Sequence, residues 1–584
     1  MTATGERNAL DPEPIQSRLR ALLDHHPDGP LPDAALRQIR TSIAPDHRSR
    51  PPSTGTLKER AQRHEAESAA ARAELIESIH AVDPTPEGLL EFGRHVRRNV
   101  EPSGFASNMG AAEFAMAPGA IRAAAEHLLD TGTSLAEICI GLNLLSLAPR
   151  DGDSERIRIF IPLGRRIEGT AIKALGRIGR AGPHLAWAAE RTPVYRRLGA
   201  VQAIWDLPER EFSELLYALP VKQSADLVQM FSALDSRPEG LQGDRRFARI
   251  LRDAARPGAL EAEPEALALA AQLWDEVRYG RCALLGFAPG EREMTTAGFQ
   301  ALLASPEASA SVDAALAATP EDPDLVWLRM RLNRAAHSDP PLPRGLAVRV
   351  SVPRPSIATQ ARTHLLLDGV PLVEAHFQRG HSGRPETVLH DGRGLEALAE
   401  PRDVKIGDTG CVEECCGAFR AVISRRGGLV EWEVRDTVLK DPPTTRLTFD
   451  ADQYDAEVVR AAADFDWEWP ARRAARLLRE RIGAESELMS RWECELAWTG
   501  SWSPDRSEMQ YSFYYPKRPS GNDAYVQFSA ARDVPYVPEV DDGAVMAVVD
   551  RIIADLRTTD PKSTARLSGG SREYAEALGF PWPP

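Results

Sequence analysis

Cysteine is scarce in this chain, which has six cysteines among 584 residues, far too few for a disulfide-stabilised scaffold. Long apolar runs are also missing, because no stretch approaches the roughly 18 consecutive apolar residues that a membrane span needs. The N-terminus, MTATGERNALDPEPIQ, is polar and has no apolar signal-peptide core. These absences predict a cytoplasmic protein with reduced thiols and no membrane partner.

A concentration of basic charge is lacking as well. The formal net charge is -14, and it is shared evenly: residues 341–584 hold 31 Lys and Arg against 38 Asp and Glu, which leaves 40 against 47 for residues 1–340. A surface that binds nucleic acid usually shows as a clustered basic patch. The charge distribution therefore argues against nucleic acid as a partner.

The familiar catalytic signatures are absent too. The sequence contains no G-x-x-x-x-G-K-[ST], no G-x-G-x-x-G after a strand, no H-E-x-x-H and no G-x-S-x-G. Its acidic residues show no paired arrangement suited to acid–base catalysis. We therefore expect a non-catalytic protein-interaction or scaffold protein with a protein partner. The alternative is an enzyme of unfamiliar type, or a zinc- or thiol-dependent protein, with its site in the C-terminal half.

The first half of the chain is a succession of helical patterns. Residues 1–55 hold one short helical pattern, Ile15–Leu23, followed by a stretch rich in Pro, Ser and Arg, and we expect a flexible N-terminal segment there. From residue 84 to 335, successive segments carry apolar residues at i, i+3 and i+4 spacing, with turn residues between them. We assign residues 56–338 to an all-α, repeat-like domain.

Similar helical patterns recur at a regular spacing in this domain, and this spacing predicts the kind of helical fold. Leu142, Leu175 and Ile204 occupy similar places in similar helical patterns, 33 and 29 residues apart, which suits helical-pair repeats. The segment AIKALGRIG resembles the second helix of HEAT-type repeats, and the resemblance covers residues 130–220. It implies a HEAT-like α-solenoid, while an ordinary helical bundle remains the alternative.

The pattern changes after a proline-rich stretch, residues 339–355, which we interpret as a linker. THLLLDGVPLVEAHF predicts two strands joined by an Asp-Gly turn, and FRAVISRRGGLVEWEVRD predicts a second hairpin around Gly427-Gly428. Helical patterns lie among the later strands, at residues 450–464, 469–482 and 543–556. Residues 356–584 are therefore expected to form an α+β domain on a mostly antiparallel sheet.

Three segments of this half carry a further resemblance: GCVEECCGAFRAVI, DFDWEWPARRAARLLRERI and GGSREYAEALGFPWP. Together they resemble the C-terminal region of uncharacterised actinobacterial proteins, over residues 345–584. The resemblance implies no activity, because none is assigned to that family.

Half of the cysteines lie within six positions, at Cys411, Cys415 and Cys416. Thiolates are preferred zinc ligands, and His381 or His390 could complete a tetrahedral set. The spacing departs from the usual C-x-x-C pair, so packing of the thiols as small apolar groups is the favoured interpretation. Reversible disulfide chemistry is the third possibility. We therefore expect no cofactor, with a zinc ion at these cysteines as the alternative.

A second local feature is the sequence Asp466-Trp467-Glu468-Trp469-Pro470 at the start of a helix. Two tryptophans there could line a groove, but anchoring of the following helix in the core is the favoured role. That helix carries five arginines, which could bind an anion and are more simply interpreted as a solvated face. They are Arg472, Arg473, Arg476, Arg479 and Arg481.

Overall fold

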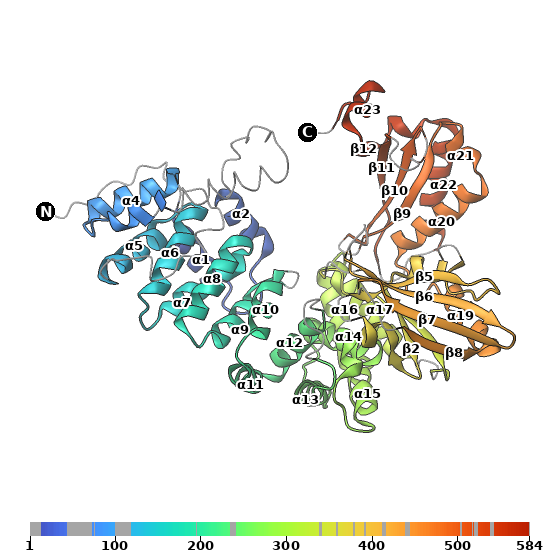
Figure 1. Ribbon diagram of the computed structural model, residues 1–584, viewed down its shortest axis with the longest axis horizontal. Helices are drawn as coiled ribbons and strands as arrows, with labels where there is room; N and C mark the ends of the chain where they lie inside the picture. Colours follow the sequence, from blue (N-terminus) through green and yellow to red (C-terminus); the bar gives the residue numbers. More distant parts are fainter. Residues whose placement is uncertain are drawn as a thin grey trace. The chain divides into compact units, whose positions relative to one another are not determined.

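In the computed structural model, contacts between Cα atoms divide the chain into two compact units, residues 1–231 and 232–584. Within the described residues, the first unit is entirely helical and the second combines helices with antiparallel sheets (Figure 1). This is the fold class that the sequence predicts. The described residues are 13–43, 73–74, 76–99, 118–193, 196–233, 241–337, 342–357, 360–377, 380–390, 393–410, 416–438, 444–502, 505–516, 518, 524–537 and 542–582.

The first unit is an array of short helices. The helix α6 (Leu135–Leu147) is buried on nearly all sides, as expected of a helix that is apolar all round, and a capping box between Ser134 and Glu137 fixes its start. The other helices are α1 (Ile15–His25), α2 (Asp33–Ile43), α4 (Pro86–Asn99), α5 (Pro118–Thr131), α7 (Asp153–Arg158), α8 (Arg165–Ile178), α9 (Gly182–Arg191), α10 (Leu198–Trp205), α11 (Glu209–Ala218) and α12 (Val221–Ala233).

The segment expected to be flexible, residues 1–55, contains α1 and α2 in its described part. The predicted helix at Ile15–Leu23 is confirmed, and it is docked: Ile15 and Leu19 are fully buried, and Gln16 donates a hydrogen bond to Asp130 over 3.0 Å. Apolar residues spaced by four supply a stripe on one face of α1. That stripe is enough to attach α1 to α5.

A half-buried carboxyl group lies between α8 and α10. Burial raises the pKa of Glu168 from 4.5 to about 7, against the opposing effects of a hydrogen bond from the Ala200 backbone and the charge of Arg196. Gly199 makes room for it, since an added Cβ there would lie 2.2 Å from Glu168 Oε1. The folded state therefore holds a proton that the unfolded chain releases between pH 4.5 and about 7.

We expect Glu168→Gln to remove a loss of stability that the parent chain suffers as the pH rises. At pH 4, below the pKa of Glu168 in both the folded and the unfolded state, the parent chain should show no loss of stability from this carboxyl group. At pH 8 the variant should be more stable by about 1–3 kcal/mol, because it avoids ionisation of a buried carboxyl group. Thermal unfolding at the two pH values measures the difference, and an unchanged pH dependence in the variant would contradict the assignment.

The second unit begins with helices and continues into three sheets. Its helices before the first strand are α13 (Arg245–Ala254), α14 (Pro264–Tyr279), α15 (Glu291–Leu303), α16 (Pro306–Ala318) and α17 (Pro323–Ala335). The first sheet pairs β1 (Leu346–Ser351) with β2 (Arg362–Leu367), and β2 with the short β3 (Val370–Pro371). All strand pairs in the described residues are antiparallel.

The second sheet has the order β4-β5-β6-β7-β8. Its strands are β4 (His381–Ser382), β5 (Arg402–Asp408), β6 (Ala418–Arg426), β7 (Leu429–Asp436) and β8 (Thr445–Asp450), and the helices α18 (Leu372–His376) and α19 (Ala451–Ala463) complete its core. The hairpin predicted around Gly427-Gly428 is confirmed as β6 and β7. The other predicted hairpin is only partly right, because the chain passes from β3 into α18 after the Asp368-Gly369 turn.

The third sheet has the order β12-β11-β10-β9, from β9 (Glu495–Gly500), β10 (Glu508–Tyr515), β11 (Val526–Asp533) and β12 (Arg566–Gly570). The helices α20 (Pro470–Ala484) and α22 (Asp542–Thr558) lie side by side against it and share its core (Figure 1). Two short helices, α21 (Glu487–Ser490) and α23 (Arg572–Ala577), complete the unit. The later helical patterns of the sequence are thus confirmed.

The proline-rich segment 339–355, expected to be a linker, includes strand β1. The helices before this segment pack against residues on its C-terminal side and within it. Trp327 of α17 donates its indole N–H to the Val352 carbonyl over 3.0 Å, and Arg281 donates to the Gly380 carbonyl over 2.7 Å. The helices between residues 245 and 335 therefore pack with the sheets that follow them in the sequence. In the described part of the chain, no helix has both the length and the apolar character needed to cross a membrane.

Candidate functional site

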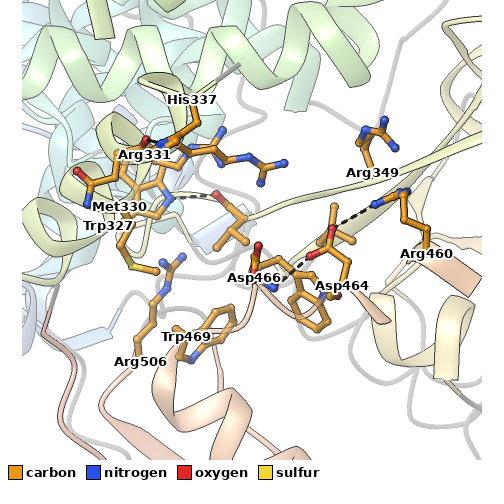
Figure 2. Close-up of a pocket in the computed structure, with 15 residues that line it drawn as sticks. Trp327, Met330, Arg331, His337, Arg349, Arg460, Asp464, Asp466, Trp469 and Arg506 are labelled. Atoms are coloured by element: carbon orange, nitrogen blue, oxygen red, sulfur yellow. Dashed lines mark hydrogen bonds and ion pairs between the residues drawn. The ribbon is translucent and has the colours of Figure 1, made fainter. Parts of the chain in front are cut away.

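A cavity of about 460 Å³ lies in the second unit, where α17, β1 and the segment between α19 and α20 meet (Figure 2). This volume falls within the range of small-molecule sites. The residues that line it are Trp327, Met330, Arg331, Asn333, Arg334, His337, Arg349, Val350, Val352, Arg460, Asp464, Asp466, Trp467, Trp469 and Arg506.

Three tryptophans form much of the buried wall. Each indole N–H donates a hydrogen bond to a protein oxygen. Trp327 donates to the Val352 carbonyl over 3.0 Å, Trp467 to the Asp464 carbonyl over 2.8 Å, and Trp469 to Ser501 Oγ over 2.9 Å. These bonds fix the orientation of the rings. The rings are thus held as rigid apolar surfaces beside the cavity.

Arg506 is the least compensated charge in this wall. Its side chain is 1% exposed, and its guanidinium group donates to Tyr536 Oη over 3.1 Å and to the Pro353 carbonyl. Its Nε has no hydrogen-bond partner, and no ion pair joins Arg506 to a carboxylate within the described residues. Burial lowers the pKa of this guanidinium. The Asp324 carboxylate acts on this charge only from beyond ion-pair distance. A buried charge without a direct ion-pair partner is costly, which makes Arg506 a candidate for binding an anion.

Aromatic rings hold the Arg506 side chain in place. The centre of its guanidinium group lies 4.8 Å from the Trp469 ring, and the side chain extends from beside Trp469 toward Trp327 and Met330 (Figure 2). Cation–π contact offsets part of the desolvation cost. It does not replace the hydrogen bonds that a carboxylate or phosphate would accept.

Three other arginines of the wall are paired with carboxylates. Arg331 forms a buried ion pair with Asp275, and Arg349 contacts Glu457 Oε1 over 2.9 Å. Arg460 pairs with Glu457 and with Asp464, the pair drawn in Figure 2.

Five arginines and one histidine face only two aspartates among the lining residues. The exposed residues Asn333, His337 and Asp466 form the rim of the cavity. The lining therefore has an excess of positive charge.

The prediction that Trp467 and Trp469 anchor the following helix agrees with their burial, and Trp469 belongs to the core beneath α20. The prediction of a solvated arginine face is wrong for Arg472, which is 5% exposed. Arg472 donates to both oxygens of Glu386, over 2.6 and 2.5 Å. It also lies over the rings of both tryptophans, so the start of α20 is held by charge as well as by apolar packing.

The candidate zinc ligands are only partly described. Cys411 and Cys415 lie outside the described residues, and Cys416 is exposed in the turn before β6. His381 is in β4, and His390 ends η7 (Glu386–His390), where its ring stacks on Phe465. Among the described side chains, no group of three His, Cys, Asp or Glu is arranged to hold a metal ion. The zinc site and its alternatives stay predictions.

Comparison with known proteins adds no identity: no protein-family model, no curated protein and no solved structure matches this chain.

Proposed function

We propose that the second unit is a binding module for a small organic anion with a flat apolar part, held in the cavity beside Arg506. The observation that carries the proposal is the buried Arg506 guanidinium, which has no carboxylate partner among the described residues and lies against a cavity of about 460 Å³. A carboxylate or phosphate can accept two parallel hydrogen bonds from one guanidinium group. The tryptophan rings offer the apolar surface that ligand pockets typically use.

The charges around the cavity indicate where the ligand's charge would lie. Arg331, Arg349 and Arg460 already have carboxylate partners, so an anion near them gains little new pairing. Arg506 lies at the buried end, whereas Asp466 is exposed at the rim. The acidic group of the ligand is therefore expected to point inward to Arg506, and the neutral part outward, past the rings.

Calorimetric titration of the full chain with benzoate, indole-3-acetate, adenosine monophosphate and inorganic phosphate tests this proposal. We expect saturable binding of at least one aromatic anion and weaker binding of phosphate alone, because phosphate has no flat apolar part.

Arg506→Gln should weaken that binding by about tenfold or more, since a charge-assisted hydrogen bond contributes about 1.5–3 kcal/mol. Asp466→Asn, at the exposed rim, should strengthen it because a repelling charge is removed.

The two variants separate loss of folding from loss of binding. Arg506 is buried, so its variant needs a circular dichroism spectrum that matches the parent. Asp466 is exposed, and its variant should fold normally. Absence of binding by all four probes, or equal binding by the parent and both variants, would contradict the proposal.

A second proposal concerns the helical unit, which we infer to be a HEAT-like solenoid that contacts a protein partner. In support, the main contacts from α4 to α11 join helices that are close neighbours in the chain, as in stacked repeats. Tyr217 at the end of α11 is 55% exposed and offers an aromatic contact. Co-purification of a reproducible partner with the full chain tests this role.

A further inference from the structure

Three side chains on β1, β2 and α18 form a connected polar chain within the second unit. Ser351 Oγ lies 2.8 Å from His364 Nε2, and the other ring nitrogen, Nδ1, lies 3.3 Å from Glu374 Oε1. The serine and the carboxylate thus contact opposite nitrogens of one imidazole. A serine nucleophile, its base and the group that orients the base are arranged in this order.

The strand pairing explains why these residues meet. In the antiparallel register of β1 and β2, Ser351 pairs with Arg362 and Arg349 pairs with His364. Ser351 and His364 are therefore diagonal neighbours on one face of the sheet, within reach of each other. The turn through β3 brings α18 back beside β2, and Glu374 is placed next to the imidazole.

Glu374, the acidic member of these three side chains, is held as a carboxylate. Burial would raise the pKa of Glu374, but contacts with His364 and Ser382 outweigh it and lower the pKa to about 2. Ser382 Oγ donates to the same oxygen, Oε1, over 2.8 Å. The contact between His364 and Glu374 is close without being aligned as a hydrogen bond, as is common before a substrate is bound.

The three side chains differ in burial in the way that nucleophilic catalysis needs. His364 and Glu374 are buried, at 3% and 6% exposed, whereas Ser351 at the end of β1 is partly exposed. Within the described residues, His364 is the only hydrogen-bond partner of the Ser351 hydroxyl. The tautomer with its proton on Nδ1, the nitrogen that faces Glu374, leaves Nε2 to accept a hydrogen bond from the Ser351 hydroxyl.

A second serine that lies close to a histidine, in the first unit, serves as a comparison. Ser78 Oγ also lies close to a histidine, 3.0 Å from His95 Nε2, but its hydroxyl donates to the Glu74 carbonyl over 2.8 Å. The proton of Ser78 is directed into the backbone of its own helix. Both serines lie close to an imidazole, but within the described residues only Ser78 also has a backbone carbonyl to which its hydroxyl donates.

We propose that Ser351 is a nucleophile that accepts an acyl group from a carboxylic ester, with His364 as general base and Glu374 as its positioning residue. Ser351 Oγ attacks the ester carbonyl carbon, and its proton moves to His364 Nε2. The bond from that carbon to the alkoxy oxygen breaks, and the leaving alcohol takes the proton from His364. Water then attacks the acyl-serine, with its proton passing through His364, to release the acid and restore the serine.

The charge balance of the cluster favours this proton transfer. Protonation of His364 creates a cation beside the buried Glu374 carboxylate, and the two opposite charges stabilise each other in a site of low polarity. Ser382 keeps the carboxylate oriented toward the ring.

The test is covalent labelling of the full chain with diisopropyl fluorophosphate, which forms a bond to serine oxygen and expels fluoride. Peptide mass spectrometry should find the label on Ser351 and not on Ser78. His364→Ala should slow labelling by about 100-fold or more, as expected for loss of a general base. Ser351→Ala should abolish the label.

Glu374→Gln keeps the size of the side chain and removes its charge, so it separates positioning from folding. This variant should be labelled more slowly than the parent chain, and its labelling rate should depend differently on pH.

Ser568→Ala, a strand serine that donates to the Gln527 carbonyl, is the control and should be labelled at Ser351 like the parent. Labelling of Ser78 and Ser351 to the same low extent in folded protein would overturn the proposal. So would a labelling rate that the Glu374 variant does not change.

Discussion

A fragment of residues 356–584 should fail to fold, whereas a fragment of residues 232–584 should fold and unfold cooperatively. The shorter fragment begins after the proline-rich segment, where the sequence predicts a domain boundary. The longer fragment begins where the contacts between Cα atoms divide the chain. Expressing both fragments therefore distinguishes the two boundaries.

The physical reason is that the shorter fragment loses part of its own core. It lacks β1, which pairs with β2 along six residues, and it lacks Val326 of α17, which belongs to the core beneath α20. It also loses Ala347 and Tyr279, which pack on Leu366. Each fully buried apolar side chain contributes about 1.5–3 kcal/mol, so removal of several exceeds the stability of an ordinary domain.

Circular dichroism in the near ultraviolet and thermal unfolding measure the outcome. The 232–584 fragment should give a fixed tertiary signal and one sharp transition. The 356–584 fragment should give neither. A sharp transition in the shorter fragment would show that the boundary near residue 340 is the correct one.

Arg354→Ala should destabilise the second unit by about 3 kcal/mol or more, the cost typical of breaking a buried ion pair. Arg354 is buried, and its guanidinium group donates to Asp324 over 2.6 Å and to both oxygens of Glu265 over 2.7 Å. Burial alone would lower the pKa of Arg354, but these two carboxylates raise it. Removing the side chain leaves Asp324 charged and largely buried.

Arg572→Ala is the matched control. Arg572 pairs with Glu576 over 2.9 Å, but its side chain is 69% exposed, and exposed pairs contribute about 0–1 kcal/mol. Urea unfolding of the full chain, followed by circular dichroism, compares the variants. Equal midpoints for the two would mean that the Arg354 pairs contribute no more to stability than an exposed pair does.

Local patterns predicted most of the helices and one hairpin because their causes are local. The spacing of apolar residues places the helices of the first unit, and Gly427-Gly428 supplies the turn that joins β6 and β7. The Asp368-Gly369 turn was also predicted correctly, since both residues have positive φ. The strand expected after it is only the short β3, and the chain then continues as the helix α18, which packs against β2 and β4.

The cavity could not be predicted, because its residues come from distant segments. Trp467 and Trp469 stand out in the sequence, and their burial was expected. Nothing in the sequence around Arg506 distinguishes it from the other arginines. The groups to which its guanidinium donates, Tyr536 Oη and the Pro353 carbonyl, come from other parts of the sequence. The sequence supplies residue types, and the missing carboxylate partner is visible only in three dimensions.

The Ser351 cluster was missed for a different reason. Familiar serine motifs place the nucleophile at a glycine-flanked turn between a strand and a helix, whereas Ser351 ends a strand. Its base His364 and the positioning residue Glu374 lie close by in the sequence, but only the register of β1 and β2 shows that His364 faces Ser351. A strand pairing shifted by one residue would have separated them.

Three of the chain's 11 tryptophans lie in the wall around Arg506, so part of the intrinsic fluorescence comes from the cavity. Trp327, Trp467 and Trp469 are buried and hydrogen-bonded, so they emit from a dry and rigid environment. A molecule that enters beside the Trp469 ring changes the field at that ring, together with the guanidinium group 4.8 Å away. Intrinsic fluorescence can therefore follow occupancy without an added dye.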